Sequence, residues 1–263
     1  MKNFALFFLL LFFFIPISCG NELEDVNRPT ASPKWTFSVL GNSISTYTGT
    51  IPNVYPSYYS IDRLAKEDMW WSILEISTKS KMIANSSWSG ATVSFRHNID
   101  TCSFFYSDER ISSLSRNGVP DVIIVLGGTN DWSKNALIGS LNDDGNVNTF
   151  CGAYMLMVKK LRNNYPHSKI VLCSILPRKQ GHDQRNNSGW TIREGNESIC
   201  QIANKFDVFF LDMDDCGLAS DITSYTFDGL HPNKTGMHLI AEKMNKEILN
   251  IMNQTSIEEY SLL

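Results

Sequence analysis

The residues best suited to chemistry are a serine near the N-terminus and an aspartate–histidine pair near the C-terminus. Ser43 ends a glycine turn, Gly41-Asn42-Ser43, and Asp228 stands three residues before His231. A serine hydroxyl is a weak nucleophile at neutral pH, so it needs a base, and histidine is the usual one. The histidine in turn needs a carboxylate that orients its ring. These residues predict a Ser-His-Asp triad for acyl transfer.

An acyl-transfer site also needs hydrogen-bond donors for the oxyanion of its tetrahedral intermediate. Two further polar segments carry suitable groups, one ending at Gly90 and the other, Gly127-Gly128-Thr129-Asn130-Asp131, in mid-chain. We expect the oxyanion hole to consist of the Ser43 N–H, the Gly90 N–H and the side-chain amide of Asn130. Asp131 is expected to order its loop and to take no part in the chemistry.

Aromatic residues stand next to these segments in the sequence. Trp88 and Trp132 each lie two residues from a candidate oxyanion donor, and Tyr47 follows Ser43. Aromatic side chains around a cleft can stack on sugar faces or line an acyl pocket, so these three residues are candidate substrate contacts. Packing of the loops over the sheet is the competing interpretation.

Strand and helix patterns alternate along the chain, and each polar segment follows a strand or precedes a helix. The expected strands are 35–40, 82–84, 121–126, 169–176 and 208–212, and the expected helices are 68–79, 108–116, 150–165, 191–206 and 234–252. This alternation predicts one α/β domain over residues 34–253, with a central parallel sheet of about five strands between two layers of helices. Ligands of such sheets bind beyond the carboxyl ends of the strands, where the polar segments fall.

Taken together, in order and spacing, the polar segments resemble those of the SGNH hydrolase superfamily, also called GDSL esterases and lipases. The resemblance covers about Phe37 to Ala241. It implies a flavodoxin-like three-layer α/β/α sandwich, no metal and no organic cofactor. It also implies a role for each residue: Ser43 as nucleophile, His231 as base, Asp228 as its partner, and Gly90 and Asn130 as oxyanion donors.

The chain departs from the family pattern at the residue before the nucleophile. The family's usual aspartate is Asn42 here. Asparagine is nearly isosteric and can still hold the turn by hydrogen bonds, but it removes a negative charge beside Ser43.

The first residues have the pattern of an export signal. Lys2 precedes an apolar run over residues 4–17, which is too short to span a bilayer comfortably. We therefore predict a signal peptide over residues 1–18. The small residues around Cys19 resemble a bacterial lipoprotein signal, in which this cysteine is lipidated. Cleavage after Gly20 by an ordinary signal peptidase is the alternative.

The predicted processing sets the expected location. Residues 19–33 would form a tether and residues 254–263 a C-terminal tail. A lipid on Cys19 would anchor the protein to a membrane of the cell envelope, whereas ordinary cleavage would leave it periplasmic or secreted. Apart from the predicted signal peptide, nothing in the sequence has the pattern of a membrane span.

The composition and the remaining motifs exclude several classes of partner. The chain has 23 basic and 27 acidic residues, a formal net charge of −4, and no basic stripe for nucleic acid or anionic lipid. Nucleotide-binding glycine loops and metal-ligand spacings are absent from the sequence. Membrane contact is expected only through the N-terminal anchor.

Cys173 lies in an apolar run that is typical of a strand, so we expect it to be a core residue.

These patterns favour a serine esterase of the cell envelope whose substrate is an ester of a small molecule or a glycan. A short acyl group on a carbohydrate, such as acetyl, is the favoured substrate. A lysophospholipase or broader lipid esterase is the competing enzyme. A non-catalytic glycan-binding protein on the same scaffold is the hypothesis from a different class.

Overall fold

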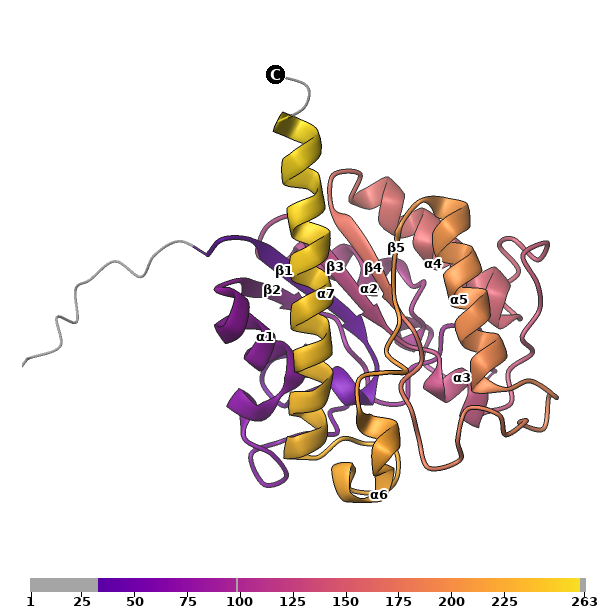
Figure 1. Ribbon diagram of the computed structural model, residues 1–263. Coiled ribbons are helices and arrows are strands. Elements are labelled where there is room, and N and C mark those ends of the chain that lie inside the picture. The colour runs from indigo at the N-terminus through magenta and orange to yellow at the C-terminus, as the bar shows by residue number, and fades with distance from the viewer. Residues whose placement is uncertain (1–32, 98, 261–263) are drawn as a thin grey trace, which may run out of the picture. The chain divides into compact units, whose positions relative to one another are not determined.

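Five parallel strands form the central sheet in the part of the chain that the structure describes (Figure 1). They are β1 (Thr36–Gly41), β2 (Lys81–Asn85), β3 (Val122–Leu126), β4 (Lys169–Cys173) and β5 (Phe209–Leu211). Their spatial order is β2-β1-β3-β4-β5, which is the flavodoxin-like order. The predicted fold class, a three-layer α/β sandwich around a parallel sheet, is confirmed.

The computed structural model describes the backbone of residues 33–97 and 99–260, and side chains as far as residue 253. The predicted signal peptide, the lipidation site Cys19 and nearly all of the tether lie outside these residues. The helices are α1 (Trp70–Thr78), α2 (Asp108–Ser112), α3 (Thr129–Ser133), α4 (Phe150–Asn164), α5 (Ile192–Phe206), α6 (Ile222–Tyr225) and α7 (Lys234–Tyr260).

Two hydrophobic cores, one on each face of the sheet, explain why the strands are apolar throughout. In β3, Val122, Ile124 and Leu126 pack in the core beneath α1 and α7. Ile123 and Val125, which point to the opposite face, pack in the core beneath α2, α4 and α5. Successive side chains of a strand alternate between faces, so a strand covered on both sides needs a continuous apolar run.

The longer helices begin at residues that cap them. At the start of α5 the Thr191 side chain accepts from the Glu194 N–H at 3.1 Å, and the Glu194 carboxylate accepts from the Thr191 N–H at 2.7 Å. At the start of α4, the Thr149 side chain accepts from the Gly152 N–H at 3.2 Å. Each cap satisfies N–H groups that have no partner within the helix.

Several element ends differ from the prediction. The helix expected over 108–116 ends as α2 at Ser112 and continues as a 3-10 turn. The strand expected over 169–176 ends earlier, at Cys173, where the pairing of β4 with the short strand β5 stops. The last helix runs beyond residue 252, so the backbone of residues 254–260 continues α7. The short helices α3 and α6 were not predicted, because a helix of one turn has too few residues to show a period.

The strand order places two of the polar segments side by side. The chain leaves β1 toward β2 at one edge and then crosses to β3 on the other side of β1, so the order reverses between β1 and β3. Gly41 at the end of β1 lies opposite Leu126 at the end of β3. The segments that carry Ser43 and Asn130 therefore leave the sheet together, at the position where ligands of this fold bind.

Candidate active site

The nucleophile candidate sits on a tight turn at the end of β1. Ser43 begins a 3-10 turn, Ser43–Ser45, and Asn42 caps it by accepting from the Ile44 N–H at 3.0 Å. A Cβ atom on Gly41 would lie 2.6 Å from the Ser87 Oγ, so only glycine fits there. Asn42 thus keeps the turn without the negative charge that an aspartate would add.

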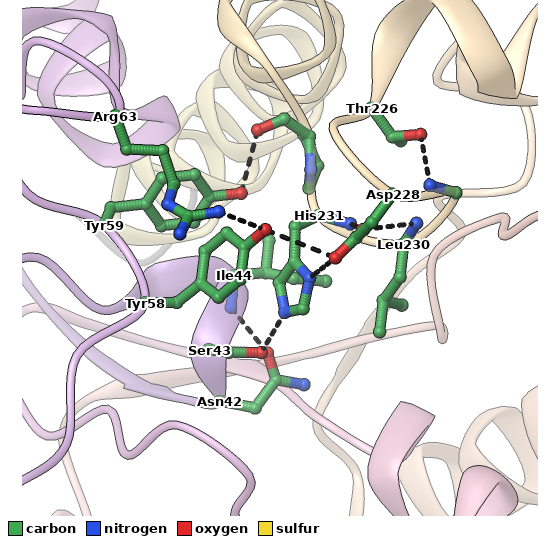
Figure 2. A network of polar contacts seen from close by, with 12 residues as sticks. Asn42, Ser43, Ile44, Tyr58, Tyr59, Arg63, Thr226, Asp228, Leu230 and His231 are labelled. Atoms are coloured by element: carbon green, nitrogen blue, oxygen red, sulfur yellow. Dashed lines mark hydrogen bonds and ion pairs between the residues drawn. The ribbon is translucent and has the colours of Figure 1, made fainter.

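The structure brings the three predicted triad residues into direct contact (Figure 2). His231 Nε2 lies 2.9 Å from the Ser43 Oγ, and His231 Nδ1 lies 2.7 Å from the Asp228 Oδ2. These distances are those of hydrogen bonds, and they form a continuous line from carboxylate to imidazole to hydroxyl. The arrangement is the one in which a histidine can accept a serine proton.

The backbone holds the carboxylate of Asp228 in place. Its Oδ1 accepts from the N–H groups of Leu230 at 3.0 Å and of His231 at 2.8 Å, which leaves Oδ2 for the imidazole. Partial burial acts to raise the pKa of Asp228, but the hydrogen bonds from the His231 backbone and ring and the charge of His231 outweigh it. The pKa of Asp228 is therefore lowered, and the group is ionised at neutral pH.

The imidazole of His231 lies in a setting that favours its neutral form. Burial is the largest effect and lowers its pKa. Asp228 opposes this through its hydrogen bond and charge, whereas the positive charges of Arg63 and Arg178 lower the pKa further. The net shift is downward, so the ring stays neutral, and able to accept a proton, to a lower pH than an unperturbed histidine.

The expected oxyanion donors come from two loops beside the nucleophile turn. Gly90 has a φ of +82°, a conformation that favours glycine. The Asn130 Nδ2 donates to the Ala91 carbonyl at 2.8 Å, and the Trp88 N–H donates to the Gly41 carbonyl at 3.1 Å, so hydrogen bonds tie these loops to each other and to β1. The oxyanion role of Ser43, Gly90 and Asn130 stays a prediction.

Asp131 orders the loop that follows Gly90, as its position suggested. The carboxylate is fully buried and accepts from the Val93 N–H at 2.9 Å, the Ser94 N–H at 2.8 Å and the Ser94 hydroxyl at 2.6 Å. It therefore links the segment after β3 to the segment after β2, and with them the loops that carry Asn130 and Gly90.

A buried arginine from α2, which the sequence analysis did not single out, also joins these loops. The guanidinium of Arg110 is fully buried and donates to the Gly41 carbonyl at 2.6 Å, the Ser86 carbonyl at 2.6 Å and the Ser103 carbonyl at 2.7 Å. Burial lowers the pKa of Arg110 to about 9, so it remains charged at neutral pH. A single side chain thus fixes the ends of β1 and β2.

Replacing Arg110 with methionine should lower the free energy of unfolding by roughly 3 kcal/mol, because buried carbonyl groups without a donor cost about 1–3 kcal/mol each. Urea denaturation followed by circular dichroism measures this change. Arg116→Met, which removes an exposed arginine nearby in the sequence, is the matched control. Equal unfolding midpoints for the two variants would contradict the role of Arg110.

Two of the three aromatic candidates are almost completely buried, which favours the competing interpretation that they pack the loops over the sheet. Tyr47 is 6% exposed, and its hydroxyl donates to the Leu64 carbonyl at 3.1 Å. Trp132 is also 6% exposed and packs in the core under α4 and α5, with the Arg178 guanidinium 4.8 Å from its ring. Trp88 is partly exposed and lies 4.4 Å from the ring of Tyr55, so it remains a candidate substrate contact.

Three residues near His231 have no counterpart in the sequence analysis. Tyr58 and Arg63 come from the irregular loop between β1 and α1. Tyr58 lies directly against the Asp228–His231 pair, and Arg63 contacts Tyr58 (Figure 2). Arg178, which follows β4, donates to the Thr129 hydroxyl at 3.0 Å. Irregular loops give no periodic signal, so only the structure could place these side chains.

Other features of the described chain bear on possible ligands. Within the described residues, no group of three or more histidine, cysteine or acidic side chains is placed to hold a metal ion, and no helix has the length and apolarity to cross a membrane. The expectation that the protein needs neither metal nor cofactor stays a prediction.

Cys102, Cys151, Cys173, Cys200 and Cys216 are free thiols, and Cys173 lies in the core as expected.

The fold and the site geometry define the protein as an ester hydrolase of the three-layer α/β type. The family model of the GDSL-like lipases and acylhydrolases matches residues 35–248, and the chain belongs to this family. The resemblance inferred from the polar segments is thereby confirmed at the level of the family. No curated protein sequence matches this chain.

Solved structures of similar fold include both lipase-like and carbohydrate-esterase proteins. A candidate GDSL-like lipase from Bacteroides ovatus ATCC 8483 is 24% identical, with a TM-score of 0.63 over 82% of this chain and 98% of its own. A carbohydrate esterase family 3 protein from Talaromyces cellulolyticus is 16% identical, with a TM-score of 0.55 over 84% and 99%. An acetyl xylan esterase is 17% identical, with a TM-score of 0.55 over 81% and 99%. At these identities the likeness shows the fold.

Proposed function

We propose that this protein is a serine esterase of the cell envelope that removes short acyl groups, acetyl foremost, from carbohydrates. The observation that carries the proposal is the line of hydrogen bonds from Asp228 through His231 to Ser43, with distances of 2.7 and 2.9 Å. Ser43, His231 and Asp228 act in it as nucleophile, general base and orienting carboxylate.

The proposed reaction proceeds through an acyl-enzyme. The Ser43 Oγ attacks the ester carbonyl while His231 Nε2 takes the hydroxyl proton, and the C–O bond to the alcohol then breaks as Nε2 returns that proton to the leaving oxygen. Water repeats the two steps on the acyl group and releases the acid. The negative charge of Asp228 stabilises the imidazolium that forms in each half of the cycle.

The oxyanion is stabilised by groups that are fixed before the substrate arrives. The N–H of Ser43 opens a 3-10 turn and has no partner within that turn, as is usual for the first residue of a helix. One hydrogen of the Asn130 amide is used by the Ala91 carbonyl, which leaves the other for the substrate. We assign the third donor to the N–H of Gly90.

Two observations support a carbohydrate ester as the substrate. Trp88 is partly exposed two residues before Gly90, where an aromatic ring could stack on a sugar face. Two structural neighbours are described as a carbohydrate esterase and an acetyl xylan esterase. The predicted signal peptide and the lipidation of Cys19 would place this activity in the cell envelope, facing external or wall glycans.

Hydrolysis of a series of p-nitrophenyl esters, beside acetate release from acetylated xylo-oligosaccharides, tests the proposal. We expect turnover of p-nitrophenyl acetate, a steep fall beyond butyrate, and covalent labelling of Ser43 by a fluorophosphonate, located by peptide mass spectrometry. Preference for long acyl chains or lysophospholipids would instead favour the lipid esterase. Glycan binding without turnover or labelling would favour the non-catalytic binding protein.

A further inference from the structure

An aromatic side chain from the loop before α1 lies flat against the imidazole of His231 (Figure 2). The rings of Tyr58 and His231 are stacked, with their centroids 3.5 Å apart and an angle of 12° between their planes. The Tyr58 hydroxyl also donates to the Asp228 Oδ2 at 3.2 Å, the same oxygen that faces His231 Nδ1. Tyr58 thus contacts both the base and its carboxylate partner.

Arg63 holds Tyr58 in this position. Its Nη1 donates to the Tyr58 hydroxyl at 2.8 Å, and its guanidinium carbon lies 4.2 Å from the centre of the Tyr58 ring. An arginine can only donate, so the Tyr58 oxygen is the acceptor in this bond and its own proton is free to point at Asp228. The direction of each hydrogen bond from Arg63 to Asp228 is therefore determined.

The loop that carries Tyr58 is fixed to both halves of the site. The Tyr58 N–H donates to the Thr46 hydroxyl at 2.9 Å, and that hydroxyl donates to the Ser43 carbonyl at 2.8 Å. The next residue, Tyr59, is fully buried and donates to the Pro232 carbonyl at 2.8 Å, directly after His231. Hydrogen bonds thus fix Tyr58 between the turn that carries Ser43 and the loop that carries His231.

We propose that Tyr58 and Arg63 are positioning residues of the esterase site. Tyr58 prevents the His231 ring from rotating away from Ser43 and fixes the Asp228 carboxylate by a second hydrogen bond, and Arg63 acts through Tyr58. A histidine base is effective only when its nitrogen is aimed at the hydroxyl, so a fixed ring raises the fraction of productive encounters. The inference rests on the proposed serine mechanism.

The same contacts have an electrostatic consequence for His231. The charged and titratable groups that face its ring are Asp228 on its own loop, Tyr58 and Arg63 from the loop before α1, and Arg178 after β4. Burial under Tyr58 and the positive charge of Arg63 both disfavour the imidazolium, and the Tyr58 hydroxyl weakens the pull of Asp228 on it. Loss of either residue should therefore raise the pKa of His231 and move the acid limb of the activity profile to higher pH.

The test compares pH profiles of kcat for p-nitrophenyl acetate in Tyr58→Phe, Arg63→Gln and the double variant. Tyr58→Phe keeps the stacked ring and removes only the hydroxyl, whose bond to a charged group should be worth about tenfold in kcat. We expect both single variants to lose activity and to shift the acid limb upward. The double variant should lose far less than the product of the single losses, because Arg63 acts through the Tyr58 hydroxyl.

Controls and a second measurement separate this inference from the function on which it rests. Tyr106→Phe and Arg193→Gln remove a tyrosine hydroxyl and an exposed arginine outside the described network and should leave the profile unchanged. An NMR titration of His231 in the full chain needs no turnover, so it tests the positioning even if no ester is hydrolysed. An acid limb and a His231 pKa that stay in place in both variants would overturn the inference, as would fully additive losses in the double variant.

Discussion

Replacing Ser43 with alanine is expected to lower kcat for p-nitrophenyl acetate by about 10⁶-fold, the size of the loss found when the serine of a triad is removed. The substitution deletes the oxygen that would attack the ester and leaves His231 Nε2 without the hydroxyl that lies 2.9 Å away. What remains is catalysis by oxyanion donors and substrate binding alone. Steady-state hydrolysis with long incubation times measures the residual rate.

Ser112→Ala is the matched control for this variant, because Ser112 is an exposed serine of α2 whose hydroxyl donates only to the Glu109 carbonyl of its own helix. It should retain the full rate. Ser43 is almost completely buried but loses only one atom, so the variant should keep its fold and its thermal unfolding midpoint. Equal rates for Ser43→Ala and the unaltered protein would exclude Ser43 as the nucleophile.

Asp228→Asn should lower kcat by about 10⁴-fold, for a reason that the local geometry makes specific. The Asp228 Oδ1 accepts two backbone N–H bonds, from Leu230 and His231. The amide oxygen of an asparagine must keep that position, so its NH₂ group must face His231 Nδ1. That nitrogen then becomes an acceptor, the ring proton moves to Nε2, and Nε2 can no longer take the proton of Ser43.

The variant should fold normally, because the two backbone bonds to the side-chain oxygen persist. Asp62→Asn removes the same charge from the loop that carries Tyr58 and serves as the control; its activity should stay near that of the unaltered protein. The kcat values of both variants at pH 7 and 9 show whether Asp228 acts as the carboxylate of the triad. A rate for Asp228→Asn close to the unaltered rate would remove Asp228 from the triad.

The strands and the contact between Asp228 and His231 could be predicted from the sequence because each depends on residues that are close in the chain. The run Val122–Leu126 is buried on both faces, and Asp228 and His231 lie within one turn of backbone. Tyr47 and Trp132 lie in the core because two residues that are near in sequence need not point in the same direction. In α3, Trp132 stands two residues after Asn130, and residues two apart on a helix point to nearly opposite sides, so Trp132 points into the core.

Tyr58 and Arg63 could not be predicted for a related reason. Their loop has no regular period, and their partners lie far away in the chain: the Tyr58 hydroxyl reaches an aspartate 170 residues later. Arg110 was missed because an arginine on a polar helix normally faces solvent, whereas here it reaches the carbonyl groups at the ends of β1 and β2. Such positions are fixed by tertiary packing alone.

The sequence separation between Ser43 and His231 determines the stage of folding at which the active site can form. The two residues stand 188 positions apart. The loop that carries His231 is followed directly by α7, which packs against α1. In the proposed mechanism, Ser43 has no base until the C-terminal segment docks. Contacts between such distant parts of a chain form late because of the large loop they must close. Under this mechanism, regain of activity during refolding would report completion of the whole domain, and a nascent chain that has not yet reached residue 231 would be inactive.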